Sequence, residues 1–319
     1  MIFLVTGGAG FIGSHFVDFL LLEEKLKQIV KKVIVLDKLT YAGNLKNLIH
    51  VEKDNRLTFI KGDIADKNLV ENLFENEMII VNFAAESHVD NSIADPRDFF
   101  STNILGTSVL LEASKSFKDI RFIQISTDEV YGSISVGSWN ENDILEPNSP
   151  YAASKAAADL ICRSYFKTFG TNVSITRCSN NFGPRQHREK FIPTILNNLL
   201  EGKKIPIYGD GKNIRDWLFV KDHVLGVWQT ILHGIPGEIY NLGGGTELSN
   251  LDLISVICSK LGYGQDSLQF VADRKGHDRR YALNYSKAIA DIGYAPSALF
   301  SAQIEHTIQY YSDLYHNLV

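Results

Sequence analysis

The chain has 319 residues, of which 45% are hydrophobic and 22% are charged, and its formal net charge is −5. These values are typical of a globular protein of about two domains. The acidic balance argues against nucleic-acid binding, and no run approaches the ~18 apolar residues of a membrane span. The three cysteines lack metal-ligand spacing and favour a reducing compartment. The N-terminal run 1–5 has no positive region, which favours the absence of a signal peptide. Together these features predict a cytoplasmic protein with no bound metal.

Short apolar runs alternate with helical patterns through the first half of the chain. The predicted strands are Ile2–Thr6, Val33–Asp37, Leu57–Lys61, Ile79–Ala84, Phe122–Thr127 and Val173–Arg177. The predicted helices are Ile12–Leu22, Lys67–Phe74, Pro96–Ser116 and Tyr151–Phe169, with a further solvated helix in the charged segment 23–32. Because strands that alternate with helices form parallel βαβ units, we expect an α/β fold with a Rossmann-type doubly wound parallel sheet.

A glycine motif follows the first predicted strand directly. Gly7, Gly10 and Gly13 have the spacing G-x-x-G-x-x-G at the start of a helix, where a tight turn and free N–H groups can hold a pyrophosphate. The second strand ends at Asp37, 24 residues after Gly13, and a carboxylate there binds a ribose diol and disfavours a 2′-phosphate. The motif therefore predicts NAD as the cofactor, with Asp63 beside the adenine.

The alternation is lost after about Asn180, where Gly and Pro become frequent and the segments shorten. We therefore expect an NAD-binding Rossmann domain over residues 1–180, completed by parts of 216–243. Residues 181–319 would form mainly a smaller, interleaved α/β domain that binds substrate.

Two residues near the start of the fourth predicted helix form the pattern Y-x-x-x-K. Tyr151 and Lys155 are four residues apart and share one helix face. A nearby ammonium favours the phenolate and lowers the pKa of the tyrosine. The pair therefore predicts a base that can deprotonate a sugar hydroxyl near neutral pH.

A hydroxyl and two carboxyl groups follow the fifth predicted strand. Thr127, Asp128 and Glu129 lie at the carboxyl end of a core strand, the edge at which ligands bind in open α/β sheets. Two carboxyl groups in one pocket tend to have separated pKa values. The pair therefore predicts one acid and one base.

Together these motifs resemble the extended short-chain dehydrogenase/reductase superfamily and, within it, the family of dTDP-glucose 4,6-dehydratases. Further matching stretches lie at 37–44, 84–90, 180–184, 215–220 and 276–281, so the resemblance runs from residue 2 to about 285. It implies a hydro-lyase of deoxysugar biosynthesis with tightly bound NAD. The reaction would convert dTDP-glucose to dTDP-4-keto-6-deoxyglucose and water through an intramolecular redox cycle.

The resemblance also implies a role for each catalytic residue. Tyr151 would take the proton of the C4 hydroxyl while NAD⁺ takes hydride from C4, and Lys155 would hold the ribose hydroxyls. Thr127 would hydrogen-bond to the C4 oxygen. Glu129 would remove the C5 proton, and Asp128 would protonate the departing C6 hydroxyl before hydride returns to C6.

Cofactor and substrate contacts follow from the same resemblance. The predicted cofactor contacts are Gly7, Gly10, Phe11, Ile12, Gly13, Asp37, Lys38, Asp63, Ile64, Ala84, Tyr151 and Lys155. The predicted substrate contacts are Ser87, Thr127, Asn180, Glu189, Lys190, Tyr208, Arg215, Asn250, Arg274, His277 and Tyr281.

The sequence also permits other functions. The chain could act on another nucleotide sugar as a 4,6-dehydratase or a 4-epimerase, or be a non-catalytic NAD-bound regulatory protein. The acidic pair argues against the epimerase, because epimerases of the superfamily generally lack it. Small and apolar residues nearly encircle the helix Tyr151–Phe169, and family members pair such helices, which predicts a homodimer through a four-helix bundle.

Overall fold

A computed structural model describes residues 1–273 and 275–316. In this part of the chain, seven strands form one parallel sheet in the order β10-β6-β5-β4-β1-β2-β3. The strands are β1 (Ile2–Thr6), β2 (Lys32–Asp37), β3 (Leu57–Lys61), β4 (Met78–Asn82), β5 (Arg121–Thr127), β6 (Val173–Cys178) and β10 (Ile239–Leu242). The six strands expected in the first half lie within two residues of their predicted bounds, and the α/β class is confirmed. The strand order reverses between β1 and β4, where open α/β sheets bind ligands.

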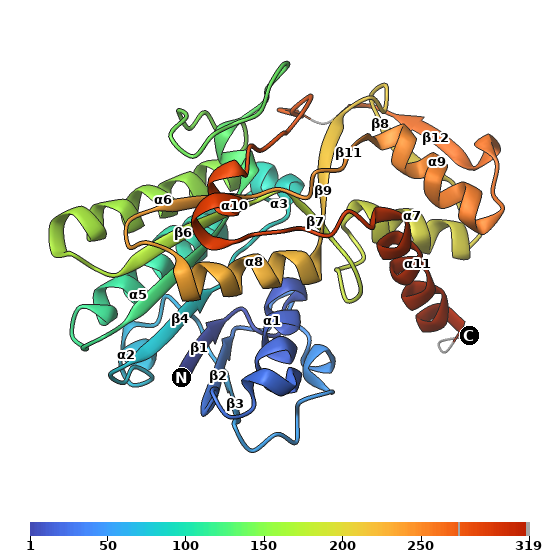
Figure 1. The fold of residues 1–319 in the computed structure, drawn as a ribbon. Coiled ribbons are helices and arrows are strands. Elements are labelled where there is room, and N and C mark those ends of the chain that lie inside the picture. The colour runs from blue at the N-terminus through green and yellow to red at the C-terminus, as the bar shows by residue number, and fades with distance from the viewer. Residues whose placement is uncertain (274, 317–319) are drawn as a thin grey trace.

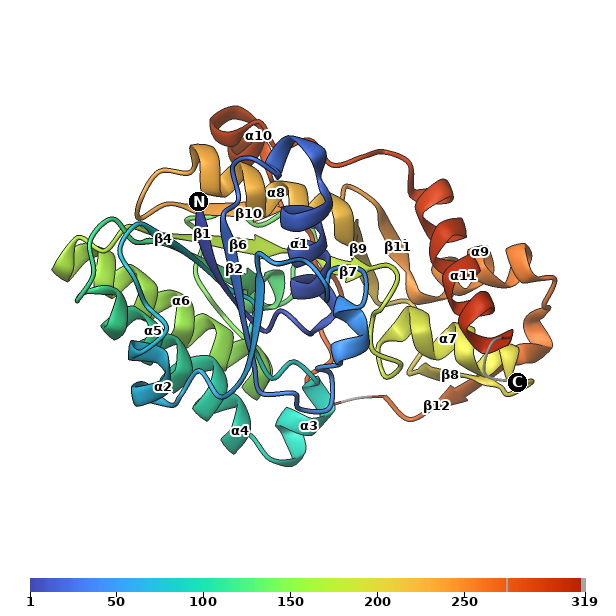
Figure 2. The same cartoon turned by 90° about the horizontal axis from the view of Figure 1, so that it is seen from below.

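Helices cover both faces of this sheet (Figures 1 and 2). One face carries α1 (Phe11–Leu22), α8 (Val220–His233) and α10 (Ser286–Ile292). The other carries α2 (Lys67–Glu71), α5 (Thr107–Ser114) and α6 (Pro150–Phe169). Phe3 and Val5 of β1 belong to the core on one face and Leu4 to the core on the other. This explains the nearly continuous apolar runs, because every strand of the sheet except the partly exposed edge strand β3 is buried on both sides.

Two helix predictions differ from the structure. The stretch predicted as one helix, 96–116, consists of α4 (Arg97–Phe99), a π-helical segment η3 (Phe100–Gly106) and α5, after a separate α3 (Val89–Ala94). The expected solvated helix over 23–32 is wrong: only the single turn η1 (Glu24–Leu26) forms. Leu26 and Val30 are buried in the core, which ties the segment down as a turn.

The second half of the chain adds two small sheets. A three-stranded sheet has the order β11-β9-β7, and β8 pairs with β12. The strands are β7 (Asn180–Phe182), β8 (Ile205–Tyr208), β9 (Ile214–Phe219), β11 (Glu247–Ser249) and β12 (Leu268–Val271). The helices are α7 (Phe191–Leu200), α9 (Asn250–Leu261) and α11 (Phe300–His316). They share a separate apolar core and lie together at one end of the molecule (Figure 1).

The two halves are interleaved rather than consecutive. β9 runs directly into α8, which packs on the large sheet, and β10 then pairs with β6 at the edge of that sheet. Short 3-10 turns complete the described elements: η2 (Leu45–Leu48), η4 (Asp128–Tyr131) and η5 (Gln265–Ser267). Within residues 1–273 and 275–316, no helix is both long and apolar enough to cross a membrane.

Candidate active site

The carboxyl ends of β1, β2, β4 and β5 open onto one cavity at the reversal point of the sheet. The glycine turn forms its floor. Gly7 has φ +66°, and a Cβ there would lie 2.6 Å from the Ala84 amide nitrogen. A Cβ on Gly13 would lie 2.3 Å from the Gly7 carbonyl oxygen. Only glycine therefore permits this approach of α1 to the turn, which leaves backbone N–H groups facing the cavity.

Asp37 holds the glycine turn from the end of β2. Its Oδ2 accepts a hydrogen bond from the Ala9 amide at 2.9 Å, and its Oδ1 accepts one from the Leu39 amide at 2.8 Å. Burial raises the pKa of Asp37, while these two donors lower it. Because each carboxylate oxygen has a further lone pair, the group can still accept from a ribose diol at the cavity wall.

The loop that follows β4 is fixed by Asn103, a residue that the sequence analysis missed. Asn103 lies buried in η3, and its amide exchanges two hydrogen bonds of 3.0 Å with the backbone of Glu86. Its Nδ2 also donates to Ser154 Oγ on α6 at 2.8 Å. An asparagine inside a predicted helix was the available signal, because this residue type is a poor helix former. Segments of π-helix are frequent at functional sites.

Tyr151 and Lys155 project from the first turns of α6. Ser149 caps this helix, and Pro150 occupies its first position. Lys155 is only 4% exposed, and its Nζ donates to the Ile125 carbonyl at 2.6 Å, which leaves two N–H donors for a ligand. Tyr151 shares a side-chain hydrogen bond with Thr127.

The expected lowering of the tyrosine pKa is not found. Burial, followed by the charge of Glu129, raises the pKa of Tyr151 well above its ordinary value. The reason is that a buried phenolate loses hydration, while the Lys155 ammonium is hydrogen-bonded to a backbone carbonyl. Burial therefore favours the protonated phenol over the phenolate.

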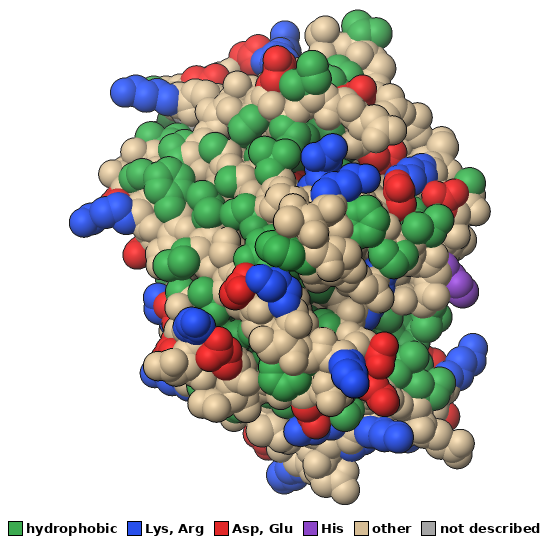
Figure 3. All heavy atoms as spheres, turned by 90° about the vertical axis from the view of Figure 1, so that its left-hand side faces the viewer, with side chains coloured by type: hydrophobic (Ala, Val, Ile, Leu, Met, Phe, Trp, Pro, Cys, Tyr) green, Lys and Arg blue, Asp and Glu red, His purple; other side chains and the backbone are tan. Residues whose placement is uncertain are grey.

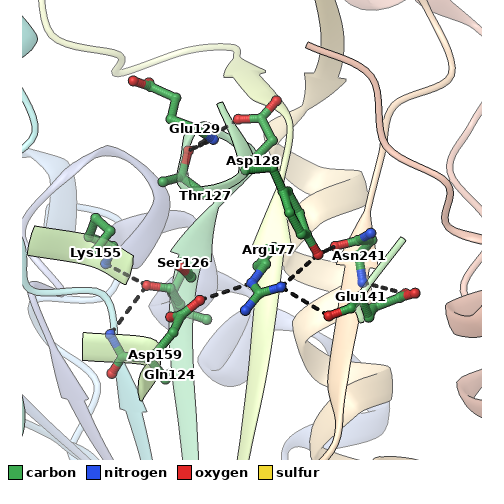
Figure 4. Close-up of polar contacts among 12 residues, drawn as sticks. Gln124, Ser126, Thr127, Asp128, Glu129, Glu141, Lys155, Asp159, Arg177 and Asn241 are labelled. Atoms are coloured by element: carbon green, nitrogen blue, oxygen red, sulfur yellow. Dashed lines mark hydrogen bonds and ion pairs between the residues drawn. The ribbon is translucent and has the colours of Figure 1, made fainter. Parts of the chain in front are cut away.

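The two adjacent carboxyl groups have different environments. Thr127 Oγ1 donates to Asp128 Oδ1 at 3.1 Å and accepts from the Glu129 amide at 3.3 Å. Asp128 is 2% exposed, and burial and then the charge of Glu129 raise its pKa well above the usual range. Glu129 is half-buried, and in Figure 4 the two side chains extend to opposite sides of Thr127. Burial thus favours the protonated form of Asp128, beside a more accessible carboxyl group.

A smaller pocket adjoins the main cavity and shares Glu129 and Asn180 with it. Arg215 of β9 donates to the Ile214 carbonyl at 2.8 Å and to the Asp278 carbonyl at 2.9 Å, and its guanidinium lies 4.4 Å from the centre of the Tyr281 ring. This pocket brings a cation and an aromatic ring next to the acidic pair. It can therefore hold the charged part of a ligand whose other end reaches the main cavity.

Most of the predicted residues line one of these two pockets. All predicted cofactor contacts, the three residues 127–129, Ser87, Asn180 and Lys190 line the main cavity. Arg215, His277 and Tyr281 line the smaller pocket.

Three predicted substrate contacts lie outside both linings. Glu189 faces His88 and His187 at 3.7 and 3.5 Å. Tyr208 packs edge-on against His277, and Asn250 begins α9. Arg274 falls outside the described residues.

Asp216 is a second residue that the sequence analysis did not assign. It is buried on β9, and its carboxylate accepts from the amides of Gly244 at 2.9 Å and Thr246 at 2.8 Å. Its charge also contributes to the raised pKa of Asp128. The only available signal was its place beside Arg215, since its role depends on a loop far along the chain.

The residues present fit NAD. Buried polar atoms without a hydrogen-bond partner among the described residues include Ser126 Oγ, Asp128 Oδ2, Asn180 Oδ1 and Gln186 Oε1, all on residues that line the main cavity. The glycine turn suits a pyrophosphate, Asp37 suits a ribose diol, and the two remaining donors of Lys155 suit a second diol. The unsatisfied atoms indicate that the cavity is completed by a polar ligand.

Known proteins are similar to this chain over nearly its whole length. The family described as GDP-mannose 4,6 dehydratase matches residues 4–307. A dTDP-glucose 4,6-dehydratase of Streptomyces antibioticus is 51% identical over 97% of this chain and 92% of its own. One of an Actinoplanes species is 49% identical over 97% of both chains.

Solved structures match over nearly the whole chain. DesIV, a dTDP-glucose 4,6-dehydratase of Streptomyces venezuelae solved with NAD bound, has a TM-score of 0.95 at 49% identity, over 98% of this chain and 97% of its own. A UDP-glucuronic acid 4-epimerase of Bacillus cereus, also solved with NAD, has a TM-score of 0.90 at 30% identity, over 99% of this chain and 100% of its own.

The parallel sheet, the glycine turn and the Tyr–Lys pair on α6 place the chain in the extended short-chain dehydrogenase/reductase superfamily. Within that class, the chain belongs to the family of dTDP-glucose 4,6-dehydratases.

Proposed function

We propose that the protein is an NAD-dependent hydro-lyase that converts dTDP-glucose to dTDP-4-keto-6-deoxyglucose and water. The observation that carries this proposal is the place of Asp128 and Glu129 in the cavity that also holds Tyr151 and Lys155. A redox base alone would serve an epimerase. A carboxyl group whose protonated form is favoured by burial, beside a second carboxyl group, adds what elimination of water requires.

When bound, NAD supplies the redox chemistry, oxidising C4 at the start of the cycle and reducing C6 at its end. Tyr151 serves as the base that takes the proton of the C4 hydroxyl. Burial and Glu129 raise the pKa of its phenol, so this base works only when positive charge opposes them. The Lys155 ammonium, on the same helix face, is the cation that this chain provides.

Elimination follows once C4 is a ketone, because the carbonyl acidifies the proton on C5. Glu129 removes this proton, and the electron pair forms the C5=C6 double bond as the C6–O bond breaks. Asp128 gives its proton to the departing oxygen, which leaves as water. When the sugar binds, the Thr127 hydroxyl turns from Asp128 to donate to the C4 oxygen and holds the sugar in place. The hydride that C4 gave up then returns to C6, and C5 regains a proton.

The smaller pocket is the proposed site of the nucleoside diphosphate. Arg215 is the cation for the pyrophosphate, and Tyr281 and His277 form the wall beside it. The shared lining residue Glu129 then lies where the hexose must bridge the two pockets. On this proposal, residues 1–180 hold NAD and the second half mainly holds the nucleotide.

We also propose that the protein acts as a cytoplasmic homodimer. Phe100 and Leu105 of η3 and Leu160 of α6 are 45%, 52% and 57% exposed, and these two elements pack together. Figure 3 shows hydrophobic side chains gathered on the side of the molecule where α5 and α6 lie in Figure 1. Pairing this surface with a second copy would form a four-helix bundle. The three cysteines are unpaired and buried, which suits a reducing compartment.

Light scattering tests the dimer. The wild type should have twice the mass of one chain, and Leu160→Glu should have the mass of one chain with an unchanged circular dichroism spectrum. A monomeric wild type would contradict the proposal.

Mass spectrometry of nucleotide sugars tests the activity. The purified protein is incubated separately with dTDP-, UDP- and GDP-linked glucose, without added NAD and then with it. We expect loss of one water from dTDP-glucose. Loss of water from another sugar alone would overturn the assigned substrate, and an unchanged mass with a C4 epimer on chromatography would overturn dehydration.

A further inference from the structure

Three ionisable side chains follow one face of α6. Tyr151, Lys155 and Asp159 are spaced at i, i+4 and i+8, which places them one above another along the helix. All three are buried, and Asp159 is only 1% exposed. The proposed mechanism uses the first two and assigns nothing to Asp159.

Asp159 is held by a single contact to a well-anchored arginine (Figure 4). Arg177 of β6 donates from Nε to Asp159 Oδ2 at 2.9 Å, and Asp159 Oδ1 has no hydrogen-bond partner among the described residues. Arg177 Nη1 donates to the Tyr131 hydroxyl at 2.7 Å and to the Glu141 carbonyl at 3.2 Å. Its guanidinium carbon lies 4.7 Å from the centre of the Tyr131 ring.

This geometry is not what stability alone requires. A buried ion pair contributes little to stability unless its remaining atoms are hydrogen-bonded, because both charges lose their hydration. Here one carboxylate oxygen is unsatisfied, and the fork of Arg177 is divided among three acceptors instead of binding the carboxylate with two bonds. The carboxylate is left free to act on another neighbour.

Lys155 is that neighbour, one helical turn away. Burial lowers the pKa of its ammonium, and the negative charge of Asp159 is the largest effect that opposes this. The other titratable groups that act on Lys155 are Cys162 on the same helix and Cys178 on β6, both buried thiols with raised pKa values and hence neutral. Asp159 is therefore the group that supplies a full negative charge.

We propose that Asp159 is a positioning residue for the proposed dehydration: its buried charge, anchored by Arg177, keeps Lys155 protonated with its donors toward the cofactor cleft. The inference rests on the proposed function of Lys155. Asp159 itself is not among the residues that line either pocket. It acts through Lys155, and through Lys155 on Tyr151.

The test is the pH profile of the Asp159→Asn variant. Without the carboxylate, Lys155 loses its proton at a lower pH. We therefore expect the alkaline limb of the pH profile of kcat/KM to move to lower pH by about one unit, which is a tenfold fall in the proton affinity of Lys155. The conservative Asp159→Glu variant should keep the wild-type limb.

Tyr131→Phe is the matched control. It removes hydrogen bonds from Arg177 and to Asn241 in the same network, at 2.7 and 2.9 Å, and changes no charge. It should lower stability without moving the alkaline limb. If the limb moves equally in Tyr131→Phe and Asp159→Asn, or in neither, Asp159 has a structural role only and the inference is wrong.

A second variant covers the case in which Asp159→Asn does not fold because Arg177 is left unpaired. The double variant Asp159→Asn/Arg177→Gln leaves no unpaired charge, and its limb should also move to lower pH, because Asp159 raises the pKa of Lys155 and Arg177 is not among the groups that shift it. An unmoved limb in this variant contradicts the inference.

The affinity for NAD⁺, titrated at pH 7 and at pH 9, separates this inference from the proposed function. Between pH 7 and pH 9, the affinity of the Asp159→Asn variant for NAD⁺ should fall several-fold more than that of the wild type. A wild type that binds NAD⁺ but dehydrates no sugar overturns the proposed function and leaves this readout intact. A variant with the wild-type pH dependence overturns the inference while the proposed function stands.

Discussion

The two sides of the cleft are built by different means. On the cofactor side, backbone forms the surface, and the glycine turn is so close-packed that a Cβ on Gly13 would lie 2.3 Å from a carbonyl oxygen. On the substrate side, side chains bind segments that are distant in the chain, as Arg215 of β9 does with the Asp278 backbone carbonyl and the Tyr281 ring. A backbone surface permits few alternatives, whereas a side-chain surface can change residue by residue. We therefore expect substitutions to have large effects on the cofactor side and graded effects on the substrate side.

Glu129 and Asn180 line both pockets, so the proposed chemistry takes place where the cofactor side and the substrate side meet.

The largest effect should come from the redox base. Tyr151→Phe removes the hydroxyl and keeps the ring, so turnover of dTDP-glucose should fall by about 10²–10⁴-fold, the usual range for a general base. The bound NAD content should stay at the wild-type level. Turnover within a factor of two of the wild type would exclude Tyr151 as the base.

The acidic pair should give the next largest effect and should divide the reaction. Glu129→Gln and Asp128→Asn should each lower dehydration by about 10²-fold, because each removes one proton transfer. In deuterated water, Asp128→Asn should still exchange the C5 hydrogen, whereas Glu129→Gln should not. Mass spectrometry of the recovered substrate measures this exchange, and equal exchange in both variants would show that the roles are misassigned.

On the substrate side, Arg215→Lys should be milder. Lysine keeps the charge but loses the planar fork that bridges two carbonyls and stacks on Tyr281. We expect KM for the nucleotide sugar to rise by about tenfold, or about 1.4 kcal/mol, with less change in kcat and none in NAD affinity. Arg279→Lys is the control, because Arg279 pairs with Asp210 at the surface, outside both linings. A loss of NAD from Arg215→Lys would contradict the separation of the two sides.

The last effect is on stability rather than on activity, and it concerns the contact between the cofactor side and the substrate side. His15 of α1 donates from Nε2 to the Pro184 carbonyl at 2.9 Å, and its Nδ1 accepts from Arg185 at 2.7 Å. This arrangement needs the neutral ring, and burial followed by the Arg185 charge lowers the pKa of His15 to about 3. The unfolded chain therefore binds more protons between pH 6.5 and 3, so this contribution to stability is full above pH 6.5 and is lost as the pH falls.

Urea denaturation at pH 7 and pH 5 measures this effect. The wild type should lose up to about 1.4 kcal/mol per pH unit for this group, and His15→Gln should lose less over the same interval. The same slope in both proteins would show that His15 is not the group that titrates. His223, whose pKa burial also lowers to about 3, contributes equally to both and cancels in the comparison.

The difference between the two sides also explains what could be predicted from the sequence. The glycine turn and the residues 127–129 are contiguous with a strand end, and Tyr151 and Lys155 share one helix face, so local spacing fixes their geometry. The positions of the substrate side depend on β9 and on loops that meet only in the folded chain. Glu189, Tyr208 and Asn250 were expected in the substrate site and line neither pocket.

Burial is the other quantity that the sequence does not contain. The pKa of Tyr151 was expected to fall because of Lys155, and it rises because both groups are buried and the lysine is bound to a carbonyl. Asn103 and Asp216 were missed for a similar reason, since each acts on a loop that folding brings to it. The charged segment 23–32 was expected to be a helix because the burial of Leu26 and Val30 could not be seen.

We propose that oxidation, elimination and reduction of one and the same sugar all take place in one cavity. The most direct test is to supply dTDP-glucose labelled with deuterium at C4, mixed with an equal amount of dTDP-glucose that carries no deuterium and has ¹³C throughout the hexose. We expect deuterium at C6 of the product, and only in the molecules with a ¹²C hexose. Deuterium on the ¹³C product, or a product without deuterium, would contradict it.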